Sequence, residues 1–197
     1  MQVFLYFRYM NKPTLFFLLL FFLQCKATAQ TFTWSEALKQ DPRSVKSLDC
    51  SGCKWDSIPI ELFQFQNLEV LNLSKNKIQD LPDQFASLVK LQELDLGRNK
   101  MTVFPLELAN LTSLKILHLD RNQITKIPQQ IASLQALETL DLYANAIEDF
   151  GEGLFALPNL KLLNLEGVMY GTVFAKSFMA KLPQTKVLMD PPCKCLD

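Results

Sequence analysis

The sequence predicts an α/β fold, a solenoid in which short parallel strands stack into a curved sheet and short helical turns lie behind it. Two observations predict this fold. Apolar residues recur with a period of 23 residues, and within each unit they alternate with polar residues as in a β-strand. The units begin at Val45, Leu68, Leu91, Leu114, Leu137 and Leu160. Because one such strand cannot bury its apolar side chains alone, successive units must stack.

Residues 1–29 are expected to be a signal peptide and not part of the fold. Arg8 and Lys12 provide a basic start, an apolar run covers 15–23, and Ala27 and Ala29 are the small residues that a signal peptidase reads. The apolar run is shorter than the about 20 residues that a spanning helix needs. The sequence therefore predicts cleavage near Ala29 and a secreted, periplasmic or cell-surface protein.

Two alternatives to a cleaved signal peptide stay open. One is an uncleaved membrane anchor. The other is a lipoprotein anchored at Cys25, although Gln24 stands where the lipoprotein signal has a small residue. The start is either Met1 or Met10, since a signal peptide counted from Met10 has the usual proportions. No later segment is long and apolar enough to span a membrane.

Charge and composition exclude some partners. The chain has 20 basic and 20 acidic residues, and the leader contains only basic ones, so the remainder is mildly acidic. Such a balance does not draw a protein to nucleic acid or to an anionic membrane. Hydrophobic residues make up 49% of the chain, which is ample for the core of one domain.

Residues 30–44 are expected to form an N-terminal cap. Thr33 followed by Glu36 fits a capping box at the start of a short helix. Trp34, Ala37 and Leu38 are expected to cover the open end of the first repeat, because a solenoid exposes its core wherever it is not capped.

Residues 45–168 hold the repeats, five full units over 45–159 and a partial sixth. After each strand comes an asparagine, at Asn76, Asn99, Asn122 and Asn145, with Cys53 at this place in the first unit. A proline then leads into a helical turn, at Pro59, Pro82, Pro105 and Pro128. A buried amide can satisfy backbone groups that the bend leaves unpaired, so we expect the asparagines inside.

The pattern LxxLxLxxNxIxxhP resembles the leucine-rich-repeat family, in its short 23-residue class and in secreted bacterial members. The units LEVLNLSKNKIQDLP and LKILHLDRNQITKIP fit it closely. The resemblance implies a leucine-rich-repeat solenoid with a concave sheet, an inward ladder of asparagines, and recognition of another macromolecule on the concave face. It implies neither a cofactor nor a catalytic site.

Residues 169–197 are expected to form a C-terminal cap and a cysteine-containing tail. Apolar residues at helical spacing predict a helix over 172–182, ended by Pro183, and 186–189 add a last strand. Helical caps are thus expected at both ends. So little chain lies outside the solenoid that no second domain is expected.

Four cysteines follow the leader, at Cys50, Cys53, Cys193 and Cys195. About five strand spacings of about 4.8 Å separate the two pairs. Neither one zinc ion nor a disulfide is therefore expected to join them, unless the tail folds back along the solenoid. Cys50 and Cys53 are expected to be small buried residues, against the alternative of a local disulfide. The tail cysteines leave a disulfide-linked dimer open, although a monomer is expected.

His118 is the only histidine, and it has Asp95 and Asp141 as row neighbours on the predicted sheet. A histidine between two acids suggests acid–base chemistry. No serine or cysteine nucleophile stands beside it, and an open sheet face does not exclude water. We therefore expect no enzymatic activity and no metal site.

The side chains that point outward from the strands are the candidate partner-binding residues. They form a mixed-charge face with isolated apolar anchors, which suits a protein surface. The candidates are Val70, Asn72, Lys75, Glu93, Asp95, Arg98, Ile116, His118, Arg121, Thr139, Asp141 and Tyr143. The predicted function is an exported protein-binding module for a protein or peptide ligand. The alternative is a structural or surface-associated protein that assembles through its ends or its cysteine tail.

Overall fold

The computed structural model describes residues 30–193. The predicted signal peptide, with its cleavage site and Cys25, lies outside the described residues, as does Cys195 in the tail.

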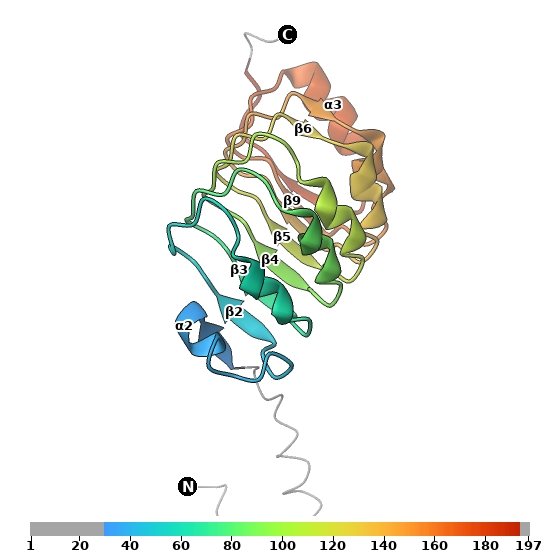
Figure 1. The fold of residues 1–197 in the computed structure, drawn as a ribbon. Coiled ribbons are helices and arrows are strands. Elements are labelled where there is room, and N and C mark those ends of the chain that lie inside the picture. Colours follow the sequence, from blue (N-terminus) through green and yellow to red (C-terminus); the bar gives the residue numbers. More distant parts are fainter. Residues whose placement is uncertain (1–29, 194–197) are drawn as a thin grey trace, which may run out of the picture. The chain divides into compact units, whose positions relative to one another are not determined.

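Eight parallel strands form the main sheet, which makes one face of the solenoid (Figure 1). Each strand bonds to its neighbour in the next repeat. In order they are β1 (Thr31–Thr33), β2 (Ser47–Asp49), β3 (Val70–Asn72), β4 (Glu93–Asp95), β5 (Ile116–His118), β7 (Thr139–Asp141), β9 (Leu162–Asn164) and β10 (Lys186–Leu188). The strands from β2 to β9 follow the predicted 23-residue period, and the sequence also predicted β10. It did not predict β1, which pairs with β2 in the segment expected to be only a helical cap.

In the described part of the chain, five short 3-10 helices lie on the face opposite the sheet (Figure 1). They are η2 (Ile60–Gln64), η3 (Asp83–Ser87), η4 (Leu106–Asn110), η5 (Gln129–Ser133) and η6 (Glu152–Ala156). The predicted prolines immediately precede the first four, where a missing N–H costs nothing. Gly151 takes this place before η6. A second sheet, β6 (Lys126–Ile127) with β8 (Asp149–Phe150), joins two adjacent repeats before these turns.

The hydrophobic core lies between the sheet and the 3-10 helices. In the six main-sheet strands β2, β3, β4, β5, β7 and β9, the middle residue is a leucine with no exposed surface. Its two neighbours in the strand are half-buried on the other face, except Ser47 of β2, which is buried. Phe85 and Leu88 close the core from the helical side. The alternation read from the sequence is therefore the alternation of burial.

The asparagines form the predicted inward ladder, and each one bonds two repeats. Asn99 shows the pattern: its Nδ2 donates to the carbonyls of Leu73 at 3.0 Å and Leu96 at 2.9 Å, and its Oδ1 accepts from Ile78 N at 3.0 Å. Asn76 and Asn122, one period away, and Asn145, two periods away, repeat these bonds.

Cys53, at the ladder position of the first repeat, is exposed, so the prediction of a buried residue was wrong. The ladder amide accepts an N–H from the preceding repeat, and the first repeat has no predecessor of that kind. Cys50 is buried as predicted. Both thiols are free, so neither is joined to the other or to Cys193, which is disulfide-bonded.

A helix lies near each end of the described solenoid, α2 (Trp34–Ala37) and α3 (Thr172–Ala180). In α2, Ala37 is buried and Trp34 packs edge-on against Trp55 at 5.0 Å between ring centroids. Leu38 is 47% exposed, so it does not cover the first repeat as expected. In residues 30–193 no helix has the length and apolar character to cross a bilayer.

Candidate functional site

The candidate residues lie in straight rows across β3, β4, β5 and β7. The first row runs Val70, Glu93, Ile116 and Thr139, and the second runs Asn72, Asp95, His118 and Asp141; both are in exact cross-strand register. All eight are half-buried, whereas the leucine between the two rows on each strand is buried. The structure thus brings these candidates together on one surface, the sheet face.

Most of the second row has a structural task that the sequence analysis missed. Asn72, Asp95 and Asp141 each accept, through Oδ1, the backbone N–H two residues later, at 2.8–3.0 Å. Asp49 and Asn164 do the same in the outer repeats. An Asp or Asn that bonds its own chain two residues on stabilises a turn. The recurrence of Asp and Asn at this offset was the available signal.

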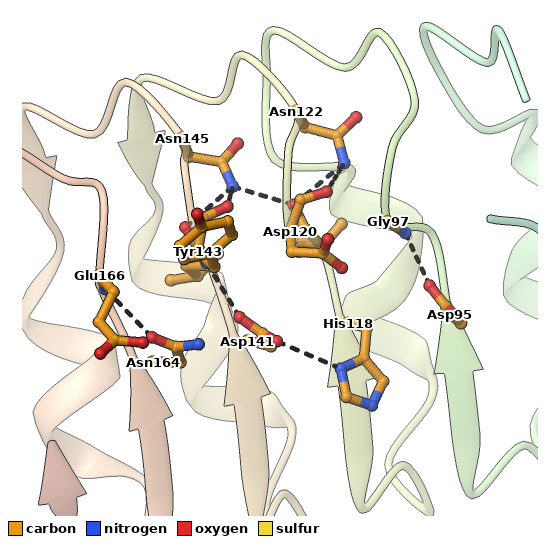
Figure 2. A network of polar contacts seen from close by, with 12 residues as sticks. Asp95, Gly97, His118, Asp120, Asn122, Asp141, Tyr143, Asn145, Asn164 and Glu166 are labelled. Atoms are coloured by element: carbon orange, nitrogen blue, oxygen red, sulfur yellow. Dashed lines mark hydrogen bonds and ion pairs between the residues drawn. The ribbon is translucent and has the colours of Figure 1, made fainter. Parts of the chain in front are cut away.

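His118 interrupts this row, because its side chain does not make the turn bond. Instead its Nδ1 lies 3.6 Å from Asp141 Oδ2 (Figure 2). The adjacent Asp141 carboxylate raises the pKa of His118 above its usual value; burial opposes this, and Asp95 and Asp120 add to it. Since turn stability does not require a histidine here, His118 is the member of the row with the strongest claim to another role.

Acidic side chains crowd around His118. The carboxylates of Asp95 and Asp120 lie over Gly97, where a Cβ would collide with Asp120. Burial raises the pKa of Asp120, and the charges of Asp141 and Asp95 add to the rise. Burial also acts to raise the pKa of Asp141, but bonds from His118 and from Tyr143 N outweigh it and leave that pKa lowered. Positive charge on His118 relieves the repulsion in this cluster.

The basic candidates occupy an unusual backbone position. Lys75, Arg98 and Arg121 have φ values of 58°, 56° and 52°, in the left-handed region. Glycine, which adopts this region without steric cost, stands at the same place in the outer repeats, as Gly52 and Gly167. All three cationic side chains are exposed. The Arg121 guanidinium stacks over the ring of Tyr143, 5.3 Å from its centroid, so these two candidate residues contact each other.

Ser74, which follows β3 between Asn72 and Lys75, is buried. Its hydroxyl donates to Asn72 Oδ1 at 2.7 Å, which draws it into the turn. The row it begins continues with Gly97, Asp120 and Tyr143, and only the last two present side chains to solvent.

The chemistry of this surface suits binding. Within residues 30–193, no group of three or more histidine, cysteine or acidic side chains is arranged to hold a metal ion. Cys50 is the free thiol nearest the sheet, and burial raises its pKa, so it is a poor nucleophile. The surface offers carboxylates, cations, one histidine and two rows of half-buried side chains.

Comparison with known proteins gives the family. The Leucine rich repeat family model matches residues 43–101 and 112–167. The chain belongs to the leucine-rich-repeat family. Members of this family are typically binding modules without enzymatic activity. A search of curated proteins found no match.

Solved leucine-rich-repeat structures are similar in fold. A leucine-rich-repeat protein of Leptospira interrogans shares 27% identity with a TM-score of 0.67, over 84% of this chain and 49% of its own. Internalin InlF of Listeria monocytogenes shares 25% with a TM-score of 0.58, over 75% and 48%. The plant peptide hormone receptor RGFR1, solved in complex with RGF2, shares 26% with a TM-score of 0.60, over 75% and 24%. The chain therefore spans half or less of the length of each of these three.

Proposed function

We propose that this leucine-rich-repeat protein is an exported, non-catalytic binding module that captures a protein or peptide partner on its sheet face. The observation that carries the proposal is the pair of in-register rows on β3 to β7, flanked by three exposed cations and Tyr143. Half-buried apolar and polar side chains beside exposed charges are the composition of protein interfaces. The plant receptor of the same fold, solved with RGF2, supports a peptide-sized partner.

Loss of partner capture on mutation of the sheet face tests this function. The chain from Gln30 onward serves as bait for extracellular material of the source organism, and captured proteins are compared between variants by mass spectrometry. The combined variant Arg98→Ala, Arg121→Ala and Tyr143→Ala is expected to lose the partner. The matched control Asp83→Ala, Gln84→Ala and Gln130→Ala, on the opposite face, is expected to keep it. Equal capture by both variants contradicts the proposal.

Export is tested separately, because it concerns residues outside the solenoid. When the full chain is expressed in a secreting host, N-terminal sequencing of the released protein is expected to begin at Gln30. A product that stays with the cells and still carries the leader contradicts export by this route and favours an anchor.

The second candidate function is assembly through the C-terminal part. Met169 and Val173 are 74% and 75% exposed there beside the partly exposed Phe174, and an exposed apolar patch of this kind marks a contact surface. Size-exclusion chromatography with and without reductant separates the two functions. A dimer under both conditions favours assembly through this apolar surface, and a monomer under both conditions favours the binding module. A dimer lost on reduction favours assembly through the cysteine tail, with the disulfide of Cys193 exchanged for one between two chains.

A further inference from the structure

Six cations line the edge of the solenoid at which the strands end. Lys75, Arg98 and Arg121 occupy the left-handed position of three successive repeats. Lys77 and Lys100 follow Lys75 and Arg98 in the same loops, and Lys54 holds the corresponding place in the first repeat. We call these six residues the basic edge. All six are exposed, and in the part of the chain that the structure describes none of them forms an ion pair.

Cations at the opposite end of the strands are, by contrast, paired across repeats. Lys46 lies 2.7 Å from Glu69, Lys115 donates to Gln92 at 2.9 Å, and Lys161 lies 2.6 Å from Glu138. The same fold thus gives each cation of one row a side-chain partner within the chain, a carboxylate for Lys46 and Lys161, and leaves the other row available. Overall charge balance does not explain this difference, since acidic residues are as numerous as basic ones.

Folding does not explain the basic edge either. Each cation in the left-handed row bears the steric penalty of a side chain at positive φ, which Gly52 and Gly167 avoid. The backbone N–H groups of Lys75 and Arg98 donate to carbonyls of the next repeat at 2.9 Å and 2.7 Å, bonds that glycine would make equally well. The long charged side chains therefore add nothing that the solenoid needs.

We propose that the basic edge binds an acidic segment of a protein or peptide partner, laid across the repeats in extended conformation. This inference rests on the proposed binding function and names the chemistry of the partner. Lys75, Arg98 and Arg121 stand on adjacent repeats about 4.8 Å apart, so they span about 10 Å. An extended segment of about three residues covers this distance and places two carboxylates on one side.

The neighbouring acidic groups favour a peptide over a uniform polyanion. Asp95 and Asp120 line the same polar hollow of about 330 Å³ as Lys75 and Arg98. A chain with a charge on every unit, such as a nucleic acid or a sulfated glycan, is repelled by these carboxylates. A peptide has neutral residues between its acids, and its backbone N–H groups can donate to the carboxylates of the hollow.

Fluorescence anisotropy on the chain from Gln30 onward tests the proposal. The probe is a labelled peptide of about ten residues that alternates glutamate and serine. The edge variant is Lys75→Gly, Arg98→Gly and Arg121→Gly, which uses the residue that the outer repeats carry at this position. Its affinity is expected to fall about tenfold or more, and binding by the unmodified protein is expected to weaken with salt. Arg98→Lys keeps the charge and is expected to keep the binding.

The matched control is Lys46→Ala, Lys115→Ala and Lys161→Ala. It removes the same three charges from the paired row, and its affinity is expected to stay within about twofold of the unmodified protein. An equal loss in both triple variants overturns the basic edge, because net charge alone then governs binding. No binding of the probe to the unmodified protein also overturns it, as does tighter binding of heparin or single-stranded DNA than of the probe.

A further variant separates this inference from the proposed function. Val70→Ser with Ile116→Ser changes the first row of the sheet face and leaves the basic edge intact. If it loses the captured partner while the glycine variant keeps it, the basic edge is overturned and sheet-face binding stands. Loss of the partner by the glycine variant supports the basic edge.

Discussion

Asn99 is the side chain whose removal best measures what the buried amide ladder contributes to stability. Its side chain is 7% exposed and bonds three backbone groups at 2.9–3.0 Å. In Asn99→Ala the Leu73 carbonyl keeps its bond from Asn76, and the Leu96 carbonyl keeps its bond from Asn122. Only Ile78 N–H loses its partner completely. The ladder is therefore redundant for the acceptors but not for this donor.

The unpaired Ile78 N–H therefore accounts for most of the expected loss of stability in Asn99→Ala. A buried unsatisfied N–H costs about 1–3 kcal/mol, and the two weakened carbonyl bonds add about 1 kcal/mol. The free energy of unfolding is expected to fall by about 2–4 kcal/mol in Asn99→Ala. The control is Asn159→Ala, whose exposed Nδ2 donates to Gln135 O at 2.8 Å and can be replaced by water. Its expected cost is about 0.5 kcal/mol.

Urea unfolding followed by circular dichroism measures both variants. The midpoint should fall clearly for Asn99→Ala at an unchanged denaturant slope, because a solenoid couples each repeat to its neighbours. A loss below about 1 kcal/mol, or one no larger than that of Asn159→Ala, would refute the reasoning. Water would then satisfy Ile78 N–H, and the asparagines would not be the link between repeats.

Three other predictions follow from single sites. NMR titration of His118 should give a pKa above 6.5, and Asp141→Asn should lower that pKa. Because the pKa of His118 is raised in the folded protein, charged His118 stabilises the fold fully below about pH 6.5. This stabilisation disappears as the pH rises through the folded pKa. A pKa unchanged by Asp141→Asn would contradict the pairing. In Gly153→Ala the new Cβ meets a backbone carbonyl of the preceding repeat, so thermal denaturation should show a loss of about 1–3 kcal/mol, and wild-type stability would show that the repeats can separate there. A thiol reagent should modify Cys53 rapidly and Cys50 only on unfolding, because Cys53 is exposed and Cys50 is buried. Burial raises the pKa of both thiols, so accessibility sets the difference, and similar rates for both would show an open first repeat.

Much of the fold was predictable because every repeat poses the same packing problem. The period of 23 residues identified the buried leucine of each strand, the prolines marked the starts of four 3-10 helices, and the asparagines had one plausible place. The prediction failed where the period ends. The strand Thr31–Thr33 has no leucine pattern of its own, and it forms because the exposed edge of β2 offers unpaired backbone groups. Cys53 also departs from the pattern at the end of the solenoid, because no preceding repeat supplies an N–H for a ladder amide to accept at that position.

The candidate surface was predictable as a set but not residue by residue. Alternation in a strand tells which side chains point outward, and the predicted rows lie on the sheet face. It does not tell whether an outward polar atom already bonds its own turn, as in Asp95, or has no ion-pair partner within residues 30–193, as in Lys75. It also does not reveal a left-handed backbone, which Arg98 and Arg121 adopt without the glycine that would signal it.

The sequence by itself determined the family, the period, the inward leucines and the inward asparagines, because these depend on local alternation repeated at a constant spacing. Only the tertiary structure decided which outward charges are available. Lys46 and Lys161 are paired with acids of neighbouring repeats, whereas Lys75 and Arg98 are not. This distinction depends on distances between side chains 23 residues apart, and the stacking of the repeats sets those distances.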